Sequence, residues 1–141
     1  MKEFKVELEI NIRFSDTDAM GVVWHGNYLR FFEDAREAFG NNYDLRYIDM
    51  YNEGYFTPIV KSEINHKSPL YYGDKVKAVA TLIPTAAAKL VFEYEIINLT
   101  SNSLSATGKT VQIFLKAKDR TLELNKPDFF AAWERKMKLR N

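Results

Sequence analysis

Two acidic residues and a glycine precede a predicted helix in the segment RFSDTDAMGVVWHGNYLRFFEDARE, residues 13–37. Asp16 and Asp18 supply carboxylates, and Gly21 lets the backbone come close to a ligand. A carboxylate can act as a nucleophile or as a general base, and the N–H groups of a helix start can bind a developing negative charge. This segment is therefore the first candidate for a site of chemistry.

Composition alone favours structural roles for these residues. Aspartates are common in turns, so Asp16 and Asp18 fit turn or capping positions. A lone histidine at a helix start, here His25, is more often structural, because one histidine defines no site without partners. The functional alternative for His25 is a side-chain donor to substrate or a modulator of Asp18. His66 is expected to be an ordinary strand-end residue, and two distant histidines without cysteine predict no metal site.

The elements around this segment follow from hydrophobic periodicity. Apolar residues alternate with polar ones from residue 4 to residue 14, which predicts a half-buried strand. Downstream the period becomes helical, with an apolar face made by Tyr28, Phe31, Phe32, Ala35 and Phe39. The site segment thus joins a strand to a long amphipathic helix.

The rest of the chain reads mainly as strands. A short second helix is expected within residues 41–56, and a strand follows from about residue 57, with Pro58 at its start. Further alternating strands are predicted at 75–83, 89–99 and 104–115, the last with Val111, Ile113 and Leu115 on one face. Pro127 suits the first turn of a final helix that runs to Lys138. Strands joined by short turns predict an α+β protein with a mostly antiparallel sheet.

Size and charge narrow the class of protein. A length of 141 residues predicts one domain, 1–141, with a core of ordinary size. The net charge of +1 gives no sign of a nucleic-acid surface. The chain has no cysteine, so disulfides and thiolate chemistry are excluded. No apolar run reaches the length of a membrane span or a signal core, so a cytoplasmic location is expected.

The run DTDAMGVVWHGNYLRFFEDAR resembles the signature of hotdog-fold thioesterases of the 4-hydroxybenzoyl-CoA thioesterase type, and of their Tol-Pal-associated acyl-CoA thioesterase branch. Weaker similarities follow in TPIV, KSPLYYGD, FEYEI and ATGKT. The resemblance implies a single hotdog domain, in which an antiparallel sheet wraps round one long central helix and a C-terminal helix follows. It implies hydrolysis of an acyl-CoA thioester, with an acyl-carrier protein as the alternative carrier and with no cofactor.

The resemblance also implies roles for individual residues. Asp18 aligns with the catalytic carboxylate, as nucleophile or general base, and Asp16 with a variable position. Residues 24 and 25 align with the helix start, where the His25 backbone N–H would face the thioester oxygen. The substrate-binding residues implied by the resemblance are Gly21, Val23, Trp24, Asn27 and Tyr28. Glu33 is the second candidate for the carboxylate, because some hotdog thioesterases use a glutamate on the helix. With Asp18 in the expected place, Glu33 is expected to be a solvated or interface acid.

The resemblance also bears on the oligomeric state of the protein. The resemblance implies a homo-oligomer with its pocket between two chains, a dimer at least, with a tetramer of two dimers as the larger expected form. The competing hypothesis is a non-catalytic hotdog module that binds acyl thioesters or serves in assembly. The His-Phe-Pro element of the dehydratase branch and the G-x-S-x-G serine elbow are both missing from the sequence.

Overall fold

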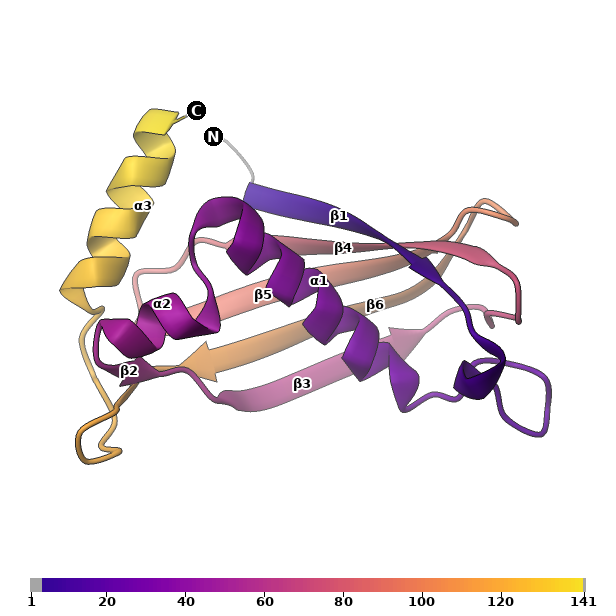
Figure 1. The fold of residues 1–141 in the computed structure, drawn as a ribbon, viewed down its shortest axis with the longest axis horizontal. Coiled ribbons are helices and arrows are strands. Elements are labelled where there is room, and N and C mark those ends of the chain that lie inside the picture. Colours follow the sequence, from indigo (N-terminus) through magenta and orange to yellow (C-terminus); the bar gives the residue numbers. More distant parts are fainter. Residues whose placement is uncertain (1–3, 141) are drawn as a thin grey trace.

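A computed structural model describes residues 4–140, and its main layer is a five-stranded sheet (Figure 1). The strand order is β1-β4-β5-β6-β3, and each neighbouring pair is antiparallel. The strands of this sheet are β1 (Phe4–Asn11), β3 (Ile59–His66), β4 (Lys75–Ile83), β5 (Lys89–Asn98) and β6 (Ser103–Ile113). β1 and β3 are therefore the two edges of the sheet.

Three helices accompany the sheet. They are α1 (Asn27–Tyr43), α2 (Tyr47–Asn52) and α3 (Asp128–Arg140). In Figure 1, α1 crosses one face of the sheet, and α3 stands at the end of the molecule where α2 also lies. A two-stranded sheet of β2 (Tyr55–Phe56) and β7 (Leu115–Lys116) lies beside α2. The α+β architecture expected from the sequence is confirmed, with a long helix on an antiparallel sheet and a C-terminal helix.

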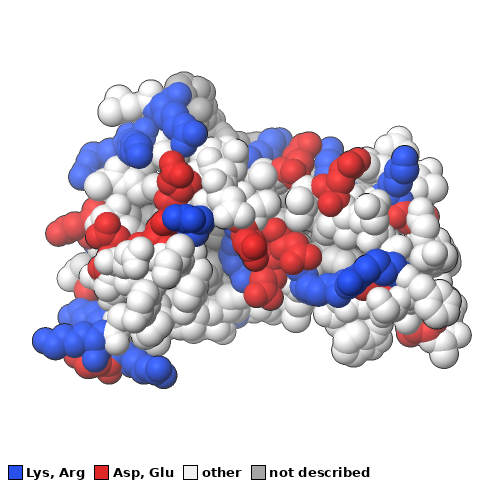
Figure 2. Space-filling view, viewed as in Figure 1, with Lys and Arg blue, Asp and Glu red and all other residues white. Residues whose placement is uncertain are grey.

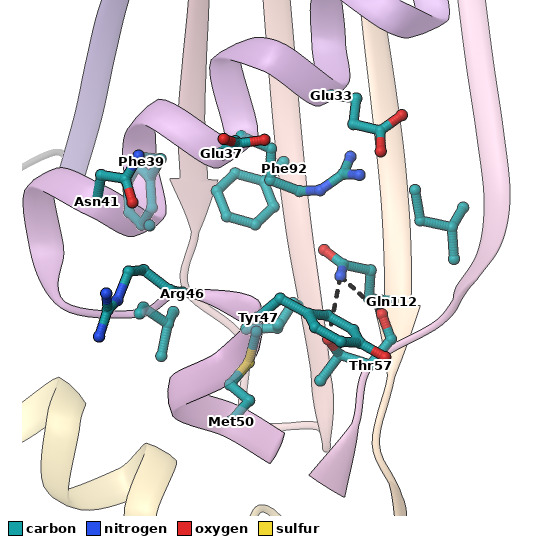
Figure 3. A pocket seen from close by; sticks show the side chains of 15 residues that line it. Glu33, Glu37, Phe39, Asn41, Arg46, Tyr47, Met50, Thr57, Phe92 and Gln112 are labelled. Carbon is teal, nitrogen blue, oxygen red and sulfur yellow. Dashed lines mark hydrogen bonds between the residues drawn. The ribbon is translucent and has the colours of Figure 1, made fainter. Parts of the chain in front are cut away.

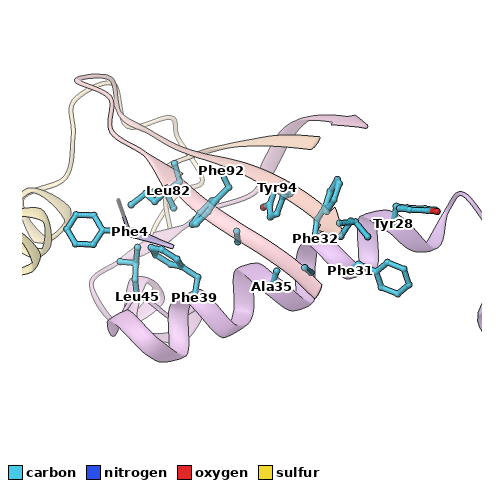
Figure 4. Close-up of a cluster of buried hydrophobic side chains, with 14 of the residues drawn as sticks. Phe4, Tyr28, Phe31, Phe32, Ala35, Phe39, Leu45, Leu82, Phe92 and Tyr94 are labelled. Atoms are coloured by element: carbon cyan, nitrogen blue, oxygen red, sulfur yellow. The ribbon is translucent and has the colours of Figure 1, made fainter. Parts of the chain in front are cut away.

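The apolar face of α1 is the centre of the core (Figure 4). The Phe32 ring stacks on Tyr94 of β5 at a centroid distance of 4.4 Å, and Phe39 meets Phe92 edge-on at 5.1 Å. Each such ring stabilises the fold by roughly 1.5–3 kcal/mol when it leaves water. Gly108 on β6 makes room for Phe32, because a Cβ there would lie 2.2 Å from the Phe32 ring.

The structure corrects one detail of the sequence interpretation and decides another that hydrophobic periodicity left open. β1 ends at Asn11, and Phe14 opens a short 3₁₀ turn (Phe14–Asp16) with 76% of its surface exposed. Near the end of β6 the buried residues are Thr110 and Gln112, whereas the apolar alternates Val111 and Ile113 are only partly buried. A period of two tells which residues share a face, but the packing of α1 decides which face is buried.

Charges are mixed over the surface. Figure 2 shows basic and acidic side chains interspersed on the face that carries α1. This distribution agrees with the net charge of +1 and gives no broad basic surface on this face. Within residues 4–140, no helix has the length and hydropathy needed to cross a membrane.

Candidate functional site

Asp18 lies in a tight turn between the 3₁₀ turn and α1. The Asp18 N–H donates to the Val22 carbonyl at 2.9 Å, and the Gly21 N–H donates to the Asp18 carbonyl at 3.0 Å. Gly21 has a φ of 81°, a left-handed conformation that costs other residues about 1–2 kcal/mol. One carboxylate oxygen of Asp18 accepts the Met20 N–H at 2.9 Å. The turn therefore presents a half-exposed carboxylate next to the helix start.

Asp16, two residues away, has a different environment. It is 2% exposed, and its carboxylate accepts the Arg13 backbone N–H at 2.9 Å and the Arg30 guanidinium at 2.5 Å. Burial by itself raises the pKa of Asp16, but the hydrogen bonds from Arg13 and Arg30 outweigh it and hold this pKa below its ordinary value. Asp16 is thus a buried, ionised cap of the 3₁₀ turn.

The backbone of Asp16 connects the turn to the helix. Its carbonyl accepts the Asn27 side-chain amide at 2.8 Å and the Trp24 N–H at 2.9 Å. Asn27 is the first residue of α1, and Arg30 on the same helix binds the Asp16 carboxylate. Asp16 therefore fixes the position of Asp18 relative to the helix start, and Asn27 holds the turn.

The helix start itself offers backbone donors. α1 begins at Asn27 with Gly26 as its N-cap, two residues later than the resemblance implied. Among residues 4–140, no acceptor is bonded to the N–H groups of His25 and Gly26. The Trp24 and His25 rings lie 5.1 Å apart and are exposed, and a Cβ on Gly26 would lie 2.3 Å from the Trp24 ring. The two N–H groups lie at the N-terminal end of α1, where the helix dipole is positive.

The side chains of Val23 and Tyr28, two of the predicted substrate-binding residues, are buried in the core. Val23 is 4% exposed, and its N–H donates to the Leu70 carbonyl at 2.8 Å. The Tyr28 phenol lies 3.4 Å from the Ser105 hydroxyl, which donates its proton to the Ser68 carbonyl at 2.6 Å. Tyr28 must therefore be the donor to Ser105, because that serine has a single hydroxyl proton. This bond anchors the start of α1 to β6.

His66 was expected to be an ordinary strand-end residue, yet it belongs to the same neighbourhood. Its ring lies edge-on to Tyr28 with centroids 4.8 Å apart. The C-terminal end of β3 is thus next to the start of α1. The Asp16 carbonyl ties the turn that carries Asp18 and Gly21 to Trp24 and Asn27 at the start of α1, where Tyr28 meets His66. Periodicity alone did not select Asp16, Arg30 and His66 as neighbours of this turn.

A cavity of about 440 Å³ lies farther along α1 (Figure 3). It is bounded by α1, α2, the residues before β3, and strands β5 and β6. Its apolar wall includes Phe39, Leu45, Met50, Leu90 and Phe92. Its polar lining includes Glu33, Arg36, Glu37, Arg46, Tyr47, Thr57 and Gln112. None of the seven residues predicted for the site lines this cavity.

Gln112 is a functional candidate that the sequence interpretation missed. It is 6% exposed, and its amide nitrogen donates to the Thr57 carbonyl at 2.8 Å. No signal in the sequence pointed to it, because Gln112 alternates with the apolar Val111 and Ile113 and its burial depends on the packing of α1. Within the described residues no group of three or more metal-binding side chains is found.

The fold and the site define a class of protein, the thioesterases. Residues 12–134 match the family model of the thioesterase-like superfamily, and the chain belongs to this superfamily. It has the hotdog-like α+β fold of these hydrolases of acyl-CoA-type thioesters.

Particular relatives agree with this class. The chain is 32% identical to YneP of Bacillus subtilis, over 92% of this chain and 96% of that protein. It is 34% identical to a 1,4-dihydroxy-2-naphthoyl-CoA hydrolase of Crocosphaera subtropica, over 78% of this chain and 83% of that enzyme. The crystal structure of a DHNA-CoA thioesterase from Staphylococcus aureus superposes with a TM-score of 0.81 at 31% identity, covering 97% of this chain and 93% of that one.

Proposed function

We propose that this protein hydrolyses acyl-CoA thioesters with Asp18 as its catalytic carboxylate. The observation that carries the proposal is the half-exposed Asp18 turn beside a helix start whose His25 and Gly26 N–H groups have no bonded acceptor within residues 4–140. Asp18 either attacks the thioester carbonyl, forming a mixed anhydride and releasing the CoA thiolate, or takes a proton from the attacking water. In the first route water then hydrolyses the anhydride and restores Asp18, so both routes end in the free acid and CoA.

The helix start supplies the second part of the mechanism. The carbonyl oxygen gains negative charge as the tetrahedral intermediate forms, and the His25 N–H donates a hydrogen bond to it. The Gly26 N–H and the helix dipole add to this stabilisation. Asp16, Arg30 and Asn27 keep the turn and the helix in register, so they act as positioning residues. Trp24 covers the approach to this point, and Gly21 lets the substrate come close to the backbone.

We infer that the working unit is a two-fold dimer formed through β3. This strand is an edge of the sheet, and seven of its eight residues are exposed, including Ile59 and Val60 at 40% and 56%. An exposed edge strand is a template for pairing with another chain. A closed two-fold dimer pairs β3 with the β3 of its partner in antiparallel orientation.

Such a dimer joins two features that are separate in one chain. His66 at the end of β3 touches Tyr28 near the helix start, and Ile59 at the beginning of β3 lines the cavity. The strand between them spans about 26 Å. Antiparallel pairing sets the end of one β3 beside the beginning of the other. The catalytic turn of one chain then faces the cavity of its partner, and the acyl group enters that cavity.

We also propose finer assignments of the domain, assembly, location and branch of this protein. They comprise one domain over 1–141, a tetramer of two dimers, a cytoplasmic location, and the Tol-Pal-associated branch of the 4-hydroxybenzoyl-CoA thioesterase type. An acyl-carrier protein is the alternative carrier of the acyl group. Glu33 lines the cavity, which makes it the second acidic group near the substrate in the dimer. Val23 shapes the site from the core, since its side chain is buried.

The experiment is a panel of acyl-CoAs of varied chain length, assayed by release of free thiol. The protein contributes no background because it has no cysteine. We expect the protein to hydrolyse at least one acyl-CoA of the panel with a kcat/KM of about 10⁴ M⁻¹s⁻¹ or more, the usual range for enzymes. Binding of acyl-CoAs without thiol release would favour the alternative, a non-catalytic acyl-thioester-binding module.

A further inference from the structure

The cavity along α1 has one polar atom that its surroundings leave unsatisfied. The side-chain oxygen of Gln112 is buried and is the only buried side-chain nitrogen or oxygen within the described residues that lacks a hydrogen-bond partner. Native proteins pair nearly all buried polar groups, so such an atom points to a ligand or to a bound water. This oxygen is not used by the catalytic turn.

The orientation of the amide is determined by Thr57. A backbone carbonyl can only accept a hydrogen bond, so the amide nitrogen of Gln112 must face the Thr57 carbonyl, 2.8 Å away. A flipped amide would bring two oxygens together. The amide oxygen therefore faces away from Thr57, and Figure 3 shows it directed into the space that the cavity side chains surround.

We propose that Gln112 selects acyl groups that carry a hydroxyl at their far part. The oxygen of Gln112 accepts a hydrogen bond from that hydroxyl, while Leu90, Phe92 and Met50 contact the apolar part of the same group. This inference rests on the proposed function, because the cavity receives the acyl group only if its thioester is the substrate. A cavity of 440 Å³ lies within the range of small-molecule sites.

Discrimination follows from the burial of the oxygen. An apolar acyl group that fills the cavity keeps water from Gln112 and leaves its acceptor unpaired, whereas a hydroxylated group restores the bond. The oxygen faces the cavity but has almost no accessible surface, so a neighbouring side chain must turn to admit the hydroxyl. Tyr47 on the short helix α2 is suited to this, because it lines the cavity and is 58% exposed.

The two arginines of the cavity have partners elsewhere. Arg36 donates to the Tyr94 hydroxyl at 3.1 Å, and Arg46 is bound to Asp49 at 2.8 Å. Neither arginine can accept a hydrogen bond, so neither replaces Gln112 as the acceptor for a hydroxyl. Glu33 and Glu37 can accept, but both lie on the exposed side of α1, where water satisfies them.

The test compares matched substrates in wild-type and variant enzymes. One set is benzoyl-CoA with its ortho, meta and para hydroxybenzoyl analogues, and the other is hexanoyl-CoA with its terminal hydroxy derivative. The measured quantity is the ratio of kcat/KM for the hydroxylated to the unsubstituted substrate. Comparing this ratio between wild type and Gln112→Met cancels differences in the intrinsic reactivity of the thioesters.

We expect the ratio to fall about 10-fold in Gln112→Met for at least one hydroxylated substrate. The matched control is Thr57→Val, which removes a hydroxyl 3.4 Å from the amide but keeps the carbonyl that orients it, so its ratio should match wild type. Gln112→Asn withdraws the oxygen by one methylene, and it should also lower the ratio if Gln112→Met fails to fold by circular dichroism.

The outcomes separate the role of Gln112 from the thioesterase activity itself. Thiol release with the same ratio in wild type and in a folded Gln112 variant would overturn the role of Gln112 and leave the thioesterase intact. No thiol release from either set or from the chain-length panel would overturn the proposed function and this inference together. A preference for hydroxylated substrates that disappears only in the Gln112 variants would support both.

Discussion

Replacing Asp18 by asparagine is the most direct perturbation of the proposed mechanism. The asparagine keeps an oxygen for the Met20 N–H, so the turn loses no hydrogen bond. We expect the free energy of unfolding to change by less than about 0.5 kcal/mol, as for most surface substitutions. An amide is neither a nucleophile nor a base at neutral pH, so kcat should fall by at least about 10²-fold, or about 2.7 kcal/mol in activation free energy.

Asp16→Asn is the matched control, with the opposite expectation. The asparagine oxygen can still accept from Arg30, but its NH₂ group then faces the Arg13 N–H, and a buried donor is left without an acceptor. Such a loss costs about 1–3 kcal/mol. Arg30 is 39% exposed, so water screens the lost charge and keeps the total near 2 kcal/mol. For a chain of this length that lowers Tm by about 6 °C.

The assay combines thiol release at 25 °C with thermal unfolding followed by circular dichroism. We expect a crossed pattern. Asp18→Asn loses activity and keeps its Tm, whereas Asp16→Asn loses Tm and much less activity, because its backbone carbonyl still binds Trp24 and Asn27. Near-wild-type turnover in Asp18→Asn would refute the mechanism. A Tm loss in Asp18→Asn equal to that in Asp16→Asn would make Asp18 a structural residue.

Four further outcomes are expected. The active protein should be a dimer or a larger closed oligomer by light scattering at assay concentration, and an active monomer would contradict the pairing of β3. His25→Tyr should retain substantial activity if the backbone N–H is the group that stabilises the intermediate. His25→Pro removes that N–H and should abolish turnover. A folded His25→Tyr as inactive as Asp18→Asn would reject this account. Because its pKa is lowered in the fold, Asp16 stabilises the protein above about pH 4, and this contribution disappears as the pH falls through the folded pKa. The difference in unfolding free energy between wild type and Asp16→Asn should therefore shrink in urea titrations as the pH falls from about 6 to about 3, and a constant difference would exclude the linkage. Gly108→Ala should lower stability by about 1–3 kcal/mol in the same titrations, because its methyl would overlap Phe32, and an unchanged midpoint would mean that this ring can move aside.

The sequence by itself determined the order of elements and the residues that share each face. Hydrophobic period depends only on local geometry, so the apolar face of α1 and the alternating strand at β5 were correctly predicted. The segment around Asp18 and Gly21 was recognisable for the same reason, since turn chemistry is local. Membership in the thioesterase class was visible in the resemblance of one motif of about 25 residues.

Tertiary structure decided what depends on contacts between distant segments. Asp16 and Asp18 are two residues apart and look alike in the sequence, yet only Asp16 meets Arg30, fourteen positions away, and becomes a buried cap. The inward face of β6 was equally undetermined, because a strand has two faces and the packing of α1 selects one. That selection buries Gln112 against Thr57, 55 positions away in the chain, and forms a cavity that no local pattern could predict.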